Sequence, residues 1–390
     1  MVRMYNLVDI FDRELEILDV NDKTMIYALD QKSDSGNLCA LGEYDFDSGE
    51  KKTLMVLEGT RLYESFRTYG AVKDYFYAVT VEDDYRLRLQ EINVHDWEIR
   101  RTFRLVPEGE VLNIYPVHPD YLIVTDEVAA TDEILMKFND EDYAGRYYTL
   151  SYLYSLKTGE KWYLQDIFYH MDVMDVQTVM MDDGSSQIIF MLQCLNQRGE
   201  RENKLWAVSL YHLMASLMEG IKPSFKQIEE SDHGITMTRI QIPQKDYCYR
   251  LVDDVSGRIE ICELKAEEGI LRKKVLTCIQ CPEDGEIIYG PEGQEVYQVK
   301  TEADGKLCVT DLSNPEKNFT FDSEYGDFTG IYMDDLAVTA FYQPRMLKED
   351  MVFKECVAVH HTDSKNVEVY DGMIQKKGRK LLMLKSFLFL

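Results

Sequence analysis

The sequence lacks an uninterrupted apolar run of the ~18 residues that a membrane-spanning helix needs. It also lacks an apolar stretch near its start, where Asp9 and Asp12 interrupt the segment that a signal peptide would require. We therefore expect no transmembrane segment, no secretory leader and a cytoplasmic location.

Basic residues are scarce. The chain has 43 Lys and Arg against 70 Asp and Glu, which gives a formal net charge of −27. Binding to nucleic acid or to anionic membranes depends on clustered Lys and Arg, so the composition argues against both. An acidic surface instead favours a basic protein partner or a metal cation.

Motifs of common enzyme classes are absent: Gly-x-x-x-x-Gly-Lys, Gly-x-Gly-x-x-Gly, His-Glu-x-x-His and Gly-x-Ser-x-Gly. The eight cysteines are scattered, and Cys278 and Cys281 form a lone Cys-x-x-Cys without the further ligands that zinc needs. The sequence therefore predicts no catalytic residue and no cofactor.

A short pattern recurs along the chain, a polar residue followed by a run of apolar and aromatic residues. Clear copies open at Asp74, Asp120, Asp246 and Asp335, and weaker copies at Asp22, Gln187 and Gln294. Their average spacing of about 52 residues is typical of repeats that each contain several short strands.

Each repeat reads as four strands separated by turn residues. In the second repeat we expect strands near 64–68, 75–81, 86–94 and 99–106. The seven units fall near 14–58, 61–108, 110–167, 170–230, 233–281, 283–323 and 325–371. This pattern resembles β-propeller repeat proteins in architecture, although the residue pairs of WD-repeat and kelch blades are missing. The resemblance implies an all-β fold, a seven-bladed β-propeller of four-stranded blades, with six or eight blades as alternatives.

Three segments interrupt the repeat. Leu210–Ile221 has apolar residues at helical spacing, which predicts a short helix between the third and fourth strands of the fourth blade. Segments 127–146 and 343–350 enlarge the loops between the second and third strands of the third and seventh blades. Alternating strand directions place both loops on one face of the ring.

Candidate site residues are the acids and histidines expected at the mouth of the central channel. They are His170, Asp172, His233, Asp253 and Asp327. The acidic run Asn139–Asp142 offers oxygen ligands for Ca²⁺, but it lacks EF-hand spacing, so a solvated acidic loop is favoured. His360 and His361 are adjacent in an expected strand, where their side chains point to opposite faces.

The C-terminal segment differs in charge from the rest of the chain. We expect a single β-propeller domain over 1–372 and a tail over 373–390 with five basic and no acidic residues. This basic and apolar tail could pack on its own propeller, dock a partner or a second copy of the chain, or lie on a membrane surface. Tyr5–Phe11 could supply a strand of the last blade and so tie the two ends together.

Function follows only from the fold at this stage. The first hypothesis is a non-enzymatic cytoplasmic scaffold that binds a protein partner through loops 127–146 and 343–350. The alternative is an enzyme, or a binder of a small ligand or divalent cation, that uses the residues at the channel mouth. A third is a subunit of a larger assembly anchored by the tail.

Overall fold

The computed structural model describes most of the chain. The described residues are 3–12, 15–21, 23–33, 36–57, 61–67, 74–82, 86–140, 143–168, 170–195, 201–220, 224–230, 235–240, 242, 245, 247–282, 284–290, 294–321, 327–333, 337–343, 356–361, 367–371, 373–377 and 380–385. Side chains are described for fewer positions, and for none between 321 and 379.

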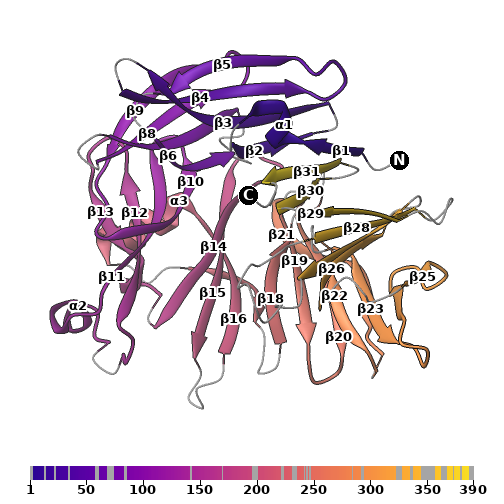
Figure 1. Ribbon diagram of the computed structural model, residues 1–390. Coiled ribbons are helices and arrows are strands. Elements are labelled where there is room, and N and C mark those ends of the chain that lie inside the picture. The colour runs from indigo at the N-terminus through magenta and orange to yellow at the C-terminus, as the bar shows by residue number, and fades with distance from the viewer. Residues whose placement is uncertain are drawn as a thin grey trace.

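The described strands form seven four-stranded antiparallel sheets in chain order, arranged as the blades of a β-propeller (Figure 1). The first four sheets are β2–β5 (Glu16–Val20, Thr24–Ser33, Gly36–Asp45, Lys51–Leu57), β6–β9 (Arg61–Arg67, Tyr75–Val81, Leu87–Asn93, Glu98–Leu105), β10–β13 (Glu110–His118, Tyr121–Ala129, Tyr147–Ser155, Lys161–Tyr163) and β14–β17 (Met171–Met180, Ser186–Leu195, Arg201–Ser209, Lys226–Glu230). The predicted seven-bladed fold is confirmed.

The last three sheets complete the ring. They are β18–β21 (Ile235–Ile240, Tyr247–Asp253, Arg258–Glu267, Ile270–Gln280), β22–β25 (Glu286–Tyr289, Val296–Thr301, Leu307–Asp311, Asn318–Phe321) and β26–β29 (Asp327–Met333, Ala337–Gln343, Cys356–His361, Val367–Asp371). Each of these seven sheets is built from four consecutive strands, so no blade takes a strand from the far end of the chain.

Core side chains lie between neighbouring sheets. One cluster joins Tyr77 and Leu89 of the second sheet to Leu122 and Tyr152 of the third, all of them fully buried. Similar clusters join the first sheet to the second, the third to the fourth, the fourth to the fifth and the fifth to the sixth. Inner strands are therefore covered on both faces, and β7 is apolar or buried along almost its whole length, as in other sheets without a solvent face.

The described residues contain three short α-helices, α1 (Leu7–Phe11), α2 (Asp132–Lys137) and α3 (Leu210–Glu219), and one 3-10 turn over Leu164–Asp166. The predicted helix is confirmed in α3, which lies between the third and fourth strands of its blade. Ser209 caps α3 by accepting a hydrogen bond from the His212 amide, and Gly220 ends it in the left-handed conformation. No described helix is long and apolar enough to cross a membrane.

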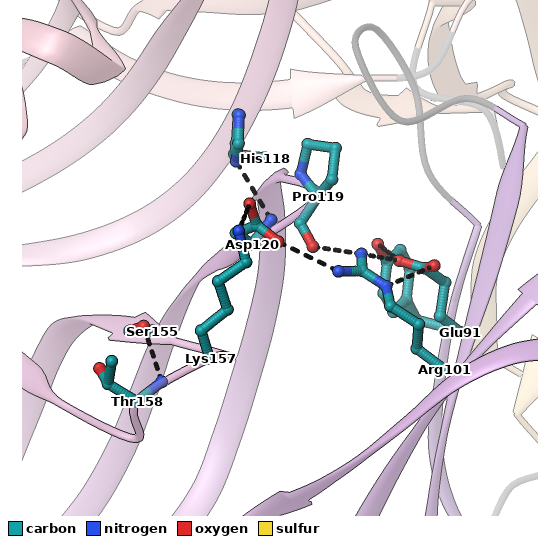
Figure 2. Close-up of polar contacts among 9 residues, drawn as sticks. Glu91, Arg101, His118, Pro119, Asp120, Ser155, Lys157 and Thr158 are labelled. Carbon is teal, nitrogen blue, oxygen red and sulfur yellow. Dashed lines mark hydrogen bonds and ion pairs between the residues drawn. The ribbon is translucent and has the colours of Figure 1, made fainter.

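Ion pairs fasten the second sheet to the third (Figure 2). Arg101 on β9 donates to the buried Glu91 on β8 at 2.9 and 2.6 Å, and to Asp120 in the turn after β10 at 3.1 Å. Lys157 donates to the other Asp120 oxygen at 2.7 Å. Asp120 opens one of the recurring sequence copies, so at this copy the polar residue holds a turn and joins two blades.

The two ends of the chain meet in a separate small sheet. β1 (Arg3–Asn6) pairs in parallel with β31 (Lys380–Lys385), which also pairs with β30 (Met373–Lys377). Tyr5–Phe11 was predicted to add a strand to the last blade. This is wrong: the seventh blade completes itself with β29, while residues 3–6 pair with the C-terminal segment and 7–11 form α1. The division into a domain and a tail stays a prediction.

This terminal sheet spans the seam between the first and last blades. Leu382 of β31 is fully buried with Leu7 and Phe11 of α1 and with Tyr44 and Phe46 of the first blade. On its other side, β30 lies against β28 of the seventh blade. The basic, apolar tail was expected to pack on its own propeller, to dock a partner or second copy, or to lie on a membrane surface. Strands β30 and β31 take the first of these positions, because they pack on their own chain.

Candidate functional site

One face of the ring carries the enlarged loops. Because strands alternate in direction, the connections between sheets and the loops between second and third strands share one side, which we call the connection face. The loop between β11 and β12 lies there, as does the connection from the third to the fourth sheet. Residues from these two segments form the candidate site.

The first of these segments is partly helical. Thr131 caps α2 through its side-chain oxygen, and Asp132 and Glu133 follow in the first turn, where negative charge is favourable. Phe138, just after the helix, is buried and stacks on Tyr148 of β12 with ring centroids 6.2 Å apart. These contacts anchor the loop that carries Asp140.

Asp140 pairs with His170. The distance from its Oδ1 to His170 Nδ1 is 3.0 Å, and the aspartate side chain is 16 % exposed against 52 % for the histidine. His170 precedes β14 and has a φ of 53°, in the left-handed region that few residues other than glycine adopt. The backbone at His170 thus turns its ring toward the loop of the preceding blade.

Asp172 lies two residues further along, on β14. Desolvation by its surroundings raises the pKa of the Asp172 carboxyl, and the negative charge of Asp140 adds to the rise. Burial and the same two carboxylates raise the pKa of Tyr143. Burial raises the pKa of Tyr148, and the negative charge of Asp140 raises it further. We call Asp140, Tyr143, Tyr148, His170 and Asp172 the mouth cluster.

Two of the five predicted site residues, His170 and Asp172, belong to the mouth cluster. Asp253 ends β19 and accepts hydrogen bonds from the Val255 and Ser256 amides at 3.0 Å, and from the Ser256 hydroxyl at 2.5 Å. These bonds lower the pKa of Asp253, and they give the residue a structural role as the cap of a turn. His233 and the Asp327 side chain lie outside the described residues, and any ligand role of these three stays a prediction.

The metal candidates gain no support from the part of the chain that the structure describes. Nowhere in it do three His, Cys, Asp or Glu side chains come close enough to hold a metal ion. In the acidic run, residues 141–142 are outside the described residues. Segment 343–350 lies outside them except for Gln343. Cys278 and Cys281 are both free thiols.

The sequence did not link His170 to Asp140. Asp140 was considered for Ca²⁺ and His170 for the channel mouth, as separate features. A usable signal existed, since a loop after the second strand and the connection to the next blade share a face in a propeller. Tyr143 and Tyr148 carried no signal, because tyrosines are common throughout the chain.

No protein-family model matches the sequence, and no curated protein matches it. Among solved structures, the chain is similar to an oligogalacturonate lyase in complex with manganese, at 14 % identity and a TM-score of 0.40, covering 82 % of both chains. It is similar to a puromycin hydrolase mutant at 10 % identity and a TM-score of 0.37, covering 95 % of this chain and 57 % of the other. A prolyl endopeptidase matches at 10 % identity and a TM-score of 0.41, covering 91 % and 49 %.

The chain thus spans about half the length of the hydrolase and the peptidase. The activities belong to those proteins. The prediction of a non-enzymatic interaction scaffold is nevertheless contradicted, because these neighbours are enzymes and the alternative reading fits them better.

Proposed function

We propose that the protein is an enzyme that hydrolyses a C–O bond, in an ester or glycoside, by general acid–base catalysis at the mouth cluster. The observation that carries this proposal is the 3.0 Å contact between His170 Nδ1 and Asp140 Oδ1 beside Asp172. A carboxylate on one ring nitrogen orients a histidine and stabilises the imidazolium that forms when it takes up a proton.

The two aspartates have different environments. Desolvation, and then the charge of Asp140, raise the pKa of Asp172, and a raised pKa is the direction that suits a general acid. Asp140 is paired with His170, so it can orient His170 as the general base. Environments that separate the protonation of two neighbouring carboxyls are a common basis for acid and base roles.

The proposed step balances as follows. A water molecule attacks the substrate carbon and gives its proton to the His170–Asp140 pair, while the C–O bond to the leaving group breaks. Asp172 donates its proton to the departing oxygen. Proton exchange with solvent then restores both groups. Tyr143 is partly exposed, and its hydroxyl donates to the Tyr147 carbonyl, so its ring is the part that it offers to a polar substrate.

The test uses His170→Gln and Asp172→Asn, with nitrophenolate release measured from a panel of chromogenic esters and glycosides. We expect each variant to lose about 100-fold or more of the activity of the unaltered protein, the usual contribution of an acid or base. His95→Gln is the matched control. It removes a second His–Asp pair, His95 with Asp74 at 3.4 Å, in a turn on the opposite face.

The pH profile gives a second readout. Only protonated Asp172 can donate, so activity should fall as the pH rises through the raised pKa of this carboxyl. Absence of activity across the panel would count against the proposal. So would a His170→Gln variant as active as His95→Gln.

A further inference from the structure

We propose that His118 is a proton-sensitive switch at the joint between the second and third blades. His118 is the last residue of β10, and Pro119 and Asp120 follow it in the turn that leads to β11. Arg101 on β9 of the second blade reaches this turn (Figure 2). The turn lies on the face opposite the connection face, and the proposal does not rest on the proposed hydrolysis.

One hydrogen bond requires the neutral form of His118. The Asp120 amide donates to His118 Nδ1 at 3.1 Å. An amide can donate only to a ring nitrogen that has a free lone pair, so Nδ1 carries no proton in this arrangement. Uptake of a proton would place a second N–H at this nitrogen, directed at the amide N–H, and the bond would break. Protonation of His118 and closure of the turn therefore exclude each other.

The turn is also held by neighbouring segments. The Asp120 carbonyl accepts from the Leu156 amide at 2.9 Å. Its carboxylate accepts from Lys157 at 2.7 Å and from Arg101 at 3.1 Å. The Pro119 carbonyl accepts a further bond from Arg101. Arg101 is the contact that comes from the second blade, and both of its bonds to the turn depend on the conformation of residues 119–120.

Burial and nearby charges set the proton affinity of His118. Partial burial of the ring is the largest effect, and it lowers the pKa of His118. Among the charged side chains of the described residues, Asp120 favours the protonated ring, whereas Lys157 in the turn after β12 and Arg101 on β9 oppose it. The net pKa lies below the ordinary value for histidine, so the ring is neutral at neutral pH and takes up a proton on acidification.

A proton on His118 would change the joint in two ways. The Asp120 amide loses its acceptor inside the turn. The imidazolium also becomes a third cation near the Asp120 carboxylate, which Arg101 and Lys157 already share. Competition for this carboxylate weakens its pair with Arg101. Because Arg101 also neutralises the buried Glu91, the change extends to the contact between the two blades.

The direction of the pH dependence follows from the lowered pKa of His118. As the pH falls below about 6.5, the unfolded chain takes up the proton before the folded protein does. The stabilisation by the neutral ring is therefore fully present above that pH, and it is lost as the pH falls through the lowered pKa of the folded protein. Acidification loosens the joint, and a return to neutral pH restores it.

The experiment follows hydrogen exchange at the Asp120 amide by NMR spectroscopy, from about pH 7.5 down to about pH 4.5, a range that spans the titration of histidine. We expect the protection factor of this amide to fall about tenfold, which corresponds to the loss of one hydrogen bond. The midpoint of the fall should coincide with the titration of the His118 Cε1–H resonance. The Arg101 Nε–H resonance should shift with the same midpoint, because Arg101 shares Asp120.

His118→Asn separates the proton from the hydrogen bond. An asparagine side chain accepts from the amide two residues further on but does not titrate, so this variant should keep the Asp120 amide protected over the whole range. His118→Phe removes the acceptor and should leave the amide unprotected even at neutral pH. His95→Asn is the matched control. It replaces an exposed histidine that pairs with Asp74 at 3.4 Å, and it should leave the pH dependence unchanged.

Constant protection of the Asp120 amide between these pH values would overturn the proposal. An equal loss of protection in His118→Asn would do the same, because that variant has no proton to take up at this position. An Arg101 resonance that does not follow the titration of His118 would show that the two blades are not coupled through this turn.

Discussion

Buried charges in this protein are balanced to different degrees. Glu91 accepts two bonds from Arg101 and a third from the Tyr77 hydroxyl at 2.7 Å. Asp126 accepts from the Tyr152 hydroxyl and the Glu108 amide, both at 2.6 Å, but its other oxygen is buried without a hydrogen bond to any described residue. Burial raises the pKa of Asp126, whereas Glu91 has a full positive charge beside it.

We expect Arg101→Gln to lower the free energy of unfolding by about 3–5 kcal/mol, because it leaves the Glu91 charge buried without its cation. Neighbouring Arg100 provides the control. Its pairs with Asp96 and Glu98 are exposed, so Arg100→Gln should cost about 1 kcal/mol or less. Urea unfolding of both variants measures the difference, and similar losses in the two would refute the role given to Arg101.

Among the single elements, β31 is the strand whose position the sequence left open. A basic and apolar segment at the end of a chain has several possible positions, and its sequence does not choose among them. The structure places its residue Leu382 in a core made by α1 and the first blade. The burial of Leu382 thus fixes the position of β31, which the net positive charge of the segment did not.

Leu382→Ala should lower the free energy of unfolding by about 2–5 kcal/mol, the usual cost of deleting a fully buried leucine side chain. Leu112→Ala on β10 is the matched control, because Leu112 is 43 % exposed. It should cost less than about 1 kcal/mol, since little apolar area is lost from the core. Chemical unfolding with a shared slope compares the two, and equal losses would contradict the packing of Leu382.

The strands were largely predictable because period-two patterns and turn residues are local. The expected strand 75–81 coincides with β7, and all seven expected units contain their four strands. Helix α2 was not predicted, since its six residues are too few for a periodic signal. The His170–Asp140 and Asp175–Arg239 contacts were not predictable either, because they join residues 30 and 64 positions apart across two blades.

In the whole molecule, the ring closes between the first and last blades without a blade that combines strands from both ends of the chain. β1 and β31 bridge the first and last blades through a sheet of their own. Stability at the seam therefore depends on two short strands that each need the other. If either is removed, the backbone groups that it paired with lose their partners.

This arrangement predicts a non-additive response to truncation. Deleting residues 1–11 and deleting residues 373–390 should each lower the midpoint of thermal unfolding. The double deletion should cost clearly less than the sum of the two, because both changes remove the same pairing. Calorimetry of the three truncated proteins tests this, and strictly additive losses would mean that the two strands stabilise the ring independently.

The pairing of Arg3 with Lys380 also has a consequence for how the protein is made. At about 5–20 residues per second, a ribosome takes about 20–75 s to synthesise the stretch between them. The blades can fold in order as they emerge, but β1 has no partner strand during that time. Until β31 has been made, the newly made chain therefore carries an open strand edge at β1, and chaperone binding to residues 3–6 would protect it during that time.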